Sequence, residues 1–146
     1  MNIPFLRYLP GLGSPPIRQV VAAGGSAPAG GATAALHYLL AELPELLLAA
    51  VLDLSTGQLL ATYAAERAYQ PSVLAAPMAA IVRQAQLLRQ AQPDEALQEV
   101  LLTLAGQLHL VRLRPGGQQA LFMAIGSHDT NLALARQLAE HAASLL

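Results

Sequence analysis

Ser127, His128 and Asp129 are the residue types of a hydrolase triad, and they stand next to one another near the end of the chain. A triad works only when three side chains converge in a line, which consecutive residues rarely achieve. Serine and aspartate also form turns and cap helices, and an amphipathic pattern follows them. We therefore interpret this tripeptide as a turn that starts a helix, and predict no catalytic residue there.

The other histidines, His37, His109 and His141, are scattered along the sequence. His37 and His141 have no second candidate ligand three or four residues away, which is the spacing that puts two ligands on one helix face. The chain contains no cysteine, which excludes disulfides, thiolate catalysis and cysteine-ligated metals. The sequence predicts no metal site.

Asp94, Glu95 and Glu99 form the nearest approach to a carboxylate cluster. Acid–base catalysis needs environments that push two carboxyl pKa values apart, and nothing apolar brackets these three residues. We interpret them as a solvated loop. Arg112 and Arg114 are two residues apart and should share one face of a strand, where they either stay solvated or bind an acidic partner.

All eight basic residues are arginine, which excludes lysine Schiff-base chemistry and the lysine-containing phosphate-binding P-loop. Gly116 and Gly117 follow Pro115 between two predicted strands and do not open a helix, so they indicate a hairpin turn and not a phosphate cradle. The chain is therefore expected to be non-enzymatic and to carry no cofactor. The lysine-free composition, rich in alanine, leucine and arginine, suggests a bacterial source.

The chain is too apolar for the surface of a monomer of its size. Its 146 residues fit one domain, the charged fraction of 12% is about half of that in typical soluble domains, and the apolar fraction is 54%. Such a composition indicates that part of the apolar surface is buried by association. The net charge of −1 argues against nucleic-acid binding.

The longest uninterrupted apolar run, Leu46 to Leu52, is far shorter than the roughly 20 residues that span a bilayer. Arg7 and several prolines interrupt the only candidate secretory signal near the start of the chain. We therefore expect no membrane insertion and a cytoplasmic location.

Residues 1–30 hold five of the ten prolines and five of the eleven glycines, and they predict a flexible tail before a single domain at residues 31–146. Hydrophobic periodicity, one continuous apolar run and the turn residues between segments predict the elements of that domain. They are a helix from its N-cap Thr33 to residue 43, a hairpin of residues 46–52 and 58–63, a helix over 72–90, strands at 97–104, 108–114 and 119–125, and a helix capped by Asp129 or Thr130.

The long helix over 72–90 has two apolar faces. One face should be buried under the sheet, and it consists of Leu74, Met78, Ile81, Val82, Ala85 and Leu88. Val73, Ala80 and Leu87 form a second stripe about 120° around the helix. One sheet covers only one face, so the second stripe predicts a helix–helix contact, most simply with a second copy. Pro77 lies either in the first turn or at a kink.

This order of elements resembles that of the roadblock family of dynein light chains and bacterial GTPase regulators. Leu46 to Thr62 is similar to the first hairpin of the family, in which an aspartate precedes a glycine-containing turn. Thr130 to Ala142 resembles the closing Asn-Leu-Gly-Leu motif, with Ala133 in place of the glycine. The resemblance covers about residues 31–146. It implies an α/β (α+β) fold with a five-stranded, antiparallel-rich sheet, helices on both faces and profilin-like layers.

The resemblance also implies a dimer in which the long helices pair and the strands that follow them join two sheets. In several members the paired helices contact a Ras-like GTPase. The residues expected at this dimer and partner interface are Val73, Ala80, Arg83, Gln84, Leu87, Gln90, Val100 and Leu102.

The resulting hypothesis is a non-catalytic homodimer that regulates or scaffolds a small Ras-like GTPase. One alternative is a small-molecule sensor of the profilin or PAS type, which requires a cavity with convergent polar groups. A second alternative is a structural subunit of a larger complex.

Overall fold

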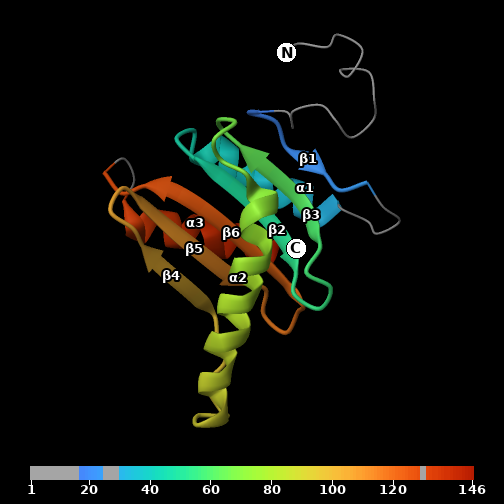
Figure 1. Ribbon diagram of the computed structural model, residues 1–146, viewed down its shortest axis with the longest axis vertical. Helices are drawn as coiled ribbons and strands as arrows, with labels where there is room; N and C mark the ends of the chain where they lie inside the picture. The colour runs from blue at the N-terminus through green and yellow to red at the C-terminus, as the bar shows by residue number, and fades with distance from the viewer. Residues whose placement is uncertain (1–16, 25–29, 129–130) are drawn as a thin grey trace, which may run out of the picture.

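An antiparallel sheet of six strands, in the order β1-β3-β2-β6-β5-β4, runs through the molecule and has helices on both faces (Figure 1). The computed structural model describes residues 17–24, 30–128 and 131–146. The elements are β1 (Val21–Ala22), α1 (Gly30–Glu42), β2 (Leu48–Asp53), β3 (Leu59–Ala64), α2 (Pro71–Gln86), the 3-10 helix η2 (Leu87–Gln90), β4 (Glu99–Thr103), β5 (Gln107–Leu113), β6 (Gln119–Gly126) and α3 (Leu132–Ser144).

The fold class predicted from the sequence is confirmed, but the expected number of five strands is wrong. The additional strand β1 pairs with β3, with Val21 opposite Thr62 and Ala22 opposite Ala61. It lies within residues 1–30, which were expected to form a flexible tail, and its two residues are too few to show a period. The rest of that expected tail, apart from residues 17–24 and Gly30, lies outside the described residues.

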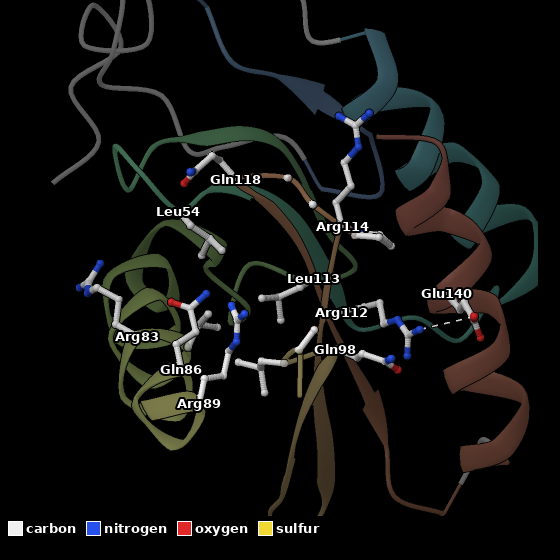
Figure 2. A pocket seen from close by; sticks show the side chains of 16 residues that line it. Leu54, Arg83, Gln86, Arg89, Gln98, Arg112, Leu113, Arg114, Gln118 and Glu140 are labelled. Atoms are coloured by element: carbon white, nitrogen blue, oxygen red, sulfur yellow. Dashed lines mark ion pairs between the residues drawn. The ribbon is translucent and has the colours of Figure 1, made fainter. Parts of the chain in front are cut away.

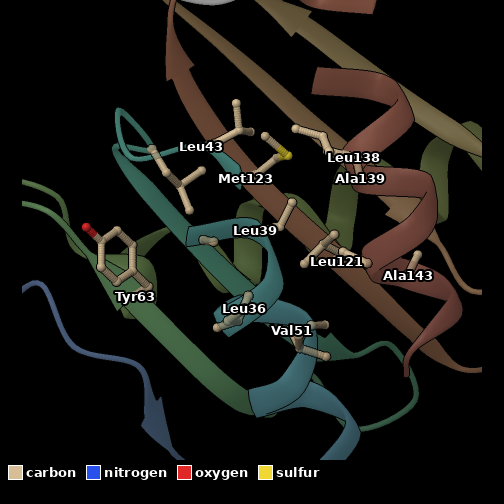
Figure 3. Packing of buried hydrophobic residues seen from close by; sticks show 14 of the residues in the cluster. Leu36, Leu39, Leu43, Val51, Tyr63, Leu121, Met123, Leu138, Ala139 and Ala143 are labelled. Atoms are coloured by element: carbon tan, nitrogen blue, oxygen red, sulfur yellow. The ribbon is translucent and has the colours of Figure 1, made fainter. Parts of the chain in front are cut away.

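Helices α1 and α3 pack side by side on one face of the sheet (Figure 3). Their buried positions are mostly alanine and leucine, and they contact sheet residues such as Val51, Leu121 and Met123. Close packing also explains Gly31 at the start of α1, because a Cβ atom there would lie 2.8 Å from the carbonyl oxygen of Leu145. The layer between the sheet and these two helices is therefore a well-packed hydrophobic core.

Helix α2 crosses the opposite face of the sheet and buries Ala75, Met78, Ala79 and Val82. Its C-terminal end and η2 extend beyond the sheet (Figure 1). Leu88, which was expected in the core, is therefore 74% exposed, because no strand lies beneath it. No helix in the described part of the chain is long and apolar enough to cross a membrane.

The helix starts differ in detail from those expected. Helix α1 begins at Gly30, so Thr33 lies inside it and is not its N-cap. The N-cap of α3 is Asn131, whose side chain accepts hydrogen bonds from the amides of Ala133 and Leu134, at 2.9 and 3.3 Å. The expected caps, Asp129 and Thr130, lie outside the described residues.

Asp53 stabilises the turn of the β2–β3 hairpin. This hairpin is the segment Leu46 to Thr62 that resembles the first hairpin of the roadblock family. One carboxylate oxygen of Asp53 accepts hydrogen bonds from the amide of Ser55 at 2.8 Å, the hydroxyl of Ser55 at 2.6 Å and the amide of Thr56 at 3.2 Å. The bond from the Ser55 hydroxyl is the main cause of a lowered pKa for the Asp53 carboxyl. Gly57 has a φ of 74°, which favours glycine.

Candidate functional site

Helix α2 begins at Pro71, which occupies the first turn, where a missing amide hydrogen costs nothing. Pro77 therefore lies inside the helix and not in its first turn. Pro77 is exposed, so its ring faces away from the sheet. The helix tightens into η2 at Leu87 and continues in that form to Gln90.

The side of α2 that faces away from the sheet is exposed and largely apolar. We call it the outer α2 face, and it consists of Val73, Ala76, Pro77, Ala80, Arg83, Gln84 and Leu87. Val73 is 61% and Leu87 51% exposed, which is high for large apolar residues. Only one of the seven residues is charged. The predicted stripe of Val73, Ala80 and Leu87 thus lies on the outer α2 face. Gln84 lies on the same face, and Gln90 is exposed in η2.

Strand β4 is an edge strand, because β5 is its only neighbour in the described sheet. Val100 and Leu102 are half-buried and pack on the same side of the sheet as α2. The sequence-predicted residues of α2 and β4 therefore belong to one side of the molecule. An edge strand also presents unpaired backbone donors and acceptors, which a second strand can use.

Two hollows flank α2. The hollow near the start of the helix has a volume of about 470 Å³ and is lined in part by Val73, Leu74, Leu104 and His109. The hollow near its C-terminal end has a volume of about 750 Å³ and lies against β5 and the β5–β6 hairpin (Figure 2).

His109 is a polar side chain in the apolar wall of the first hollow. It is buried, and its Nε2 atom lies 2.9 Å from Oε1 of Gln107. Within the described residues, its Nδ1 atom has no hydrogen-bond partner. Burial lowers the pKa of His109, which favours the neutral imidazole. The sequence carries no signal that places His109 beside α2.

The residues considered for catalysis do not form a site in the described chain. The hydroxyl of Ser127 donates to the carbonyl of Ala105 at 3.4 Å, which ties two loops together. His128 is exposed, and Asp129 lies outside the described residues. The ring of the exposed His141 contacts that of Tyr38 in a tilted arrangement, with ring centroids 4.6 Å apart. The described residues contain no cluster of three or more residues able to hold a metal ion.

The interpretation of Glu99 as part of a solvated loop was wrong. Glu99 begins β4, and its side chain is only 11% exposed. Its carboxylate lies 2.7 Å from Nε of Arg136 and 3.5 Å from NH1 of Arg112, and Arg112 also pairs with Glu140 at 3.5 Å. Arg112 is therefore partly buried in an ion-pair network and does not keep its face of β5 solvated. Asp94 is exposed, as expected.

No family model and no curated protein matches the sequence. Solved structures do match its fold. MglB of Myxococcus xanthus superposes with a TM-score of 0.71 at 15% identity, over 84% of this chain and 90% of that chain. An MglB described as having a tetrameric arrangement superposes with a TM-score of 0.66 at 20% identity, over 85% of this chain and 90% of that chain.

A roadblock/LC7 domain from Streptomyces avermitilis gives a TM-score of 0.61 at 16% identity, over 72% of this chain and 85% of that chain. The chain therefore has the roadblock fold.

Proposed function

We propose that this protein is a non-catalytic homodimer that binds a small Ras-like GTPase, as its regulator or scaffold. The observation that carries the proposal is the outer α2 face. It is apolar and exposed on a helix whose opposite face is already buried against the sheet. Exposed apolar surface of this kind is typical of a protein interface.

The composition of the outer α2 face suits contact with a second helix. Ala76 and Ala80 are small and lie between the larger Val73 and Leu87, so two helices can approach closely at the centre. Val100 and Leu102 extend the apolar surface toward the β4 edge. A symmetric contact would pair both α2 helices and both β4 edges, and the tetrameric arrangement described for one MglB supports association in this fold.

The GTPase partner is suggested by the roadblock resemblance, because several members of that family contact a Ras-like GTPase through their paired α2 helices. Arg83 and Gln84 lie exposed on the same face and supply polar contacts beside the apolar stripe. A regulator of this type acts by ordering the switch loops of the GTPase, where the charge of the transition state is stabilised. Arg83 is the one cation of the outer α2 face that is placed to contribute to such a contact.

The dimer is tested with Ala80→Arg, which puts a charge at the centre of the outer α2 face. Ala133→Arg is the matched control, because Ala133 is also an exposed helical alanine but lies on α3. In sedimentation equilibrium, the wild type and Ala133→Arg should be dimers and Ala80→Arg a monomer, because an unpaired charge is costly in an apolar contact. A monomeric wild type, or equal behaviour of the two variants, contradicts the proposal.

The GTPase contact is tested with a small Ras-like GTPase from the same organism, loaded with GDP or with a non-hydrolysable GTP analogue. Binding should depend on the nucleotide and should be lost in Ala80→Arg but not in Ala133→Arg. GTP hydrolysis with and without the protein then separates a regulator from a scaffold. Absence of binding in both nucleotide states removes the GTPase from the proposal and leaves the dimer standing.

A further inference from the structure

The hollow at the C-terminal end of α2 contains four arginines, half of the eight in the chain. We call it the arginine cavity, after Arg83 of α2, Arg89 of η2, Arg112 of β5 and Arg114 at the end of β5 (Figure 2). The chain has no lysine and a net charge of −1, so half of its permanent positive charge lines one cavity. The proposed dimer and GTPase contact use only Arg83.

Three of the four arginines carry uncompensated charge. Arg112 is paired with Glu99 and Glu140, both at 3.5 Å. The other three form no ion pair with any residue of the described chain. Among the described residues that line the cavity, Glu140 is the only acidic one. Asp94 and Glu95 lie in the connection to β4 and remain exposed outside the cavity. The cavity is therefore a local surplus of positive charge on a slightly acidic protein.

The arginines do not converge on one point. In Figure 2, the guanidinium groups of Arg83 and Arg114 point outward in different directions, and Arg89 lies between α2 and β5. A compact phosphate needs several donors around one centre, whereas separated guanidinium groups suit carboxylates spaced along an extended ligand.

The rest of the cavity wall fits a peptide. Leu54, Val82 and Leu113 give it an apolar floor, and Gln86 and Gln118 add amide donors and acceptors that a peptide backbone can use. Aromatic residues that would stack nucleic-acid bases are absent from the residues lining this cavity. The combination favours a polypeptide over a single-stranded nucleic acid.

We propose that the arginine cavity binds an acidic, extended segment of a partner protein in which carboxylate side chains alternate with apolar ones. The segments of this chain outside the described residues do not supply such a ligand. Residues 1–16 and 25–29 contain no aspartate or glutamate, and residues 129–130 contain only Asp129. The inference goes beyond the proposed dimer and GTPase contact and does not depend on it.

The first test measures fluorescence anisotropy of a fluorescein-labelled twelve-residue peptide of alternating glutamate and leucine with glycine spacers. A matched peptide with glutamine in place of glutamate is the control. The acidic peptide should bind more tightly than the neutral one, and its binding should weaken as salt is raised, because separated surface charges are screened. Equal binding of the two peptides overturns the proposal.

The second test uses the double variant Arg89→Gln/Arg114→Gln, which spares Arg83 of the outer α2 face. Arg18→Gln/Arg67→Gln is the matched control, because it removes two exposed arginines outside the cavity. The cavity variant should lose about tenfold in peptide affinity and the control less than about twofold, as expected for two exposed charge pairs. Equal losses would show a general charge effect and overturn the proposal.

Two further results would identify another occupant of the arginine cavity and would also overturn the proposal. Single-stranded DNA of equal charge is tested as a competitor, and tighter binding of that DNA than of the acidic peptide assigns the cavity to nucleic acid. A shift of Arg89→Gln/Arg114→Gln to monomers in sedimentation assigns it to a second copy of the chain. Ala80→Arg should still bind the acidic peptide in preference to the neutral one, which separates failure of this inference from failure of the proposed dimer.

Discussion

At the scale of single residues, Glu99 joins the edge strand to the helical layer behind it. Its carboxylate pairs with Arg112 of the neighbouring strand and with Arg136 of α3. Glu99→Gln removes the charge and leaves the partly buried Arg112 with only the exposed Glu140. We expect the free energy of unfolding, measured by urea denaturation, to fall by roughly 1–3 kcal/mol.

Glu140→Gln is the control for that prediction, because it removes a carboxylate from the same network at a side chain that is 68% exposed. An exposed pair typically contributes about 0–1 kcal/mol, so this variant should remain close to the wild type. An equal fall in the free energy of unfolding for both variants would mean that the burial of Glu99 does not strengthen the contribution of its ion pairs.

His109 gives a prediction in pH. Its folded-state pKa lies below the ordinary value of 6.5 because burial disfavours the imidazolium. The unfolded chain therefore binds the proton more readily, so the contribution of the neutral ring is complete above pH 6.5 and is lost as the pH falls toward the folded-state pKa. The Tm of His109→Leu should fall less between pH 7.5 and pH 5.5 than that of the wild type.

His37→Gln is the control, because His37 is exposed on α1. It should keep the pH dependence of the wild type. The same slope for His109→Leu and the wild type would mean that other groups dominate stability in this range.

At the scale of elements, the cap of α3 is set by one side chain. Asn131 accepts hydrogen bonds from two amides that otherwise have no partner within the helix. Asn131→Ala should lower the free energy of unfolding by about 1 kcal/mol, and Asn131→Asp should retain most of it, because aspartate caps equally well. Equal losses for both variants in urea denaturation would contradict this assignment.

The elements with long patterns could be predicted from the sequence. Among the described residues, five of the six strands and all three α-helices follow apolar patterns, either periodic or continuous, and Pro71 marks the start of α2. Strand β1 was missed because two residues carry no period and its pairing with Thr62 and Ala61 is a tertiary contact. Leu88 was misplaced because periodicity gives the face of a helix but not where the sheet beneath it ends.

The candidate site could also be predicted only in part. The exposed stripe of Val73, Ala80 and Leu87 follows from helical spacing once one face is assigned to the core. The arginine cavity was not predicted, because Arg89 and Arg114 are brought together by the crossing of α2 over the sheet. Glu99 was read as solvated because its partner Arg136 lies far away in sequence on α3.

At the scale of the whole molecule, association accounts for apolar surface that the core does not use. Two helical layers and the sheet bury or half-bury most of the described leucines, yet Val73 and Leu87 remain exposed on one side. Leu134 is similarly exposed, at 46%, on α3 at the opposite face. Substitutions at Leu87 and at Leu134 can therefore distinguish a specific interface on α2 from a general effect of exposed apolar surface.

Leu87→Glu should weaken the dimer and Leu134→Glu should not. A dimer that forms only between folded chains adds stability that grows with protein concentration, so the Tm of the wild type should rise with concentration. Leu134→Glu should show the same rise, whereas the Tm of Leu87→Glu should be nearly independent of concentration because glutamate desolvated in an apolar contact opposes pairing. A concentration-independent Tm for the wild type, together with a monomer in sedimentation, would mean that the outer α2 face does not pair with itself.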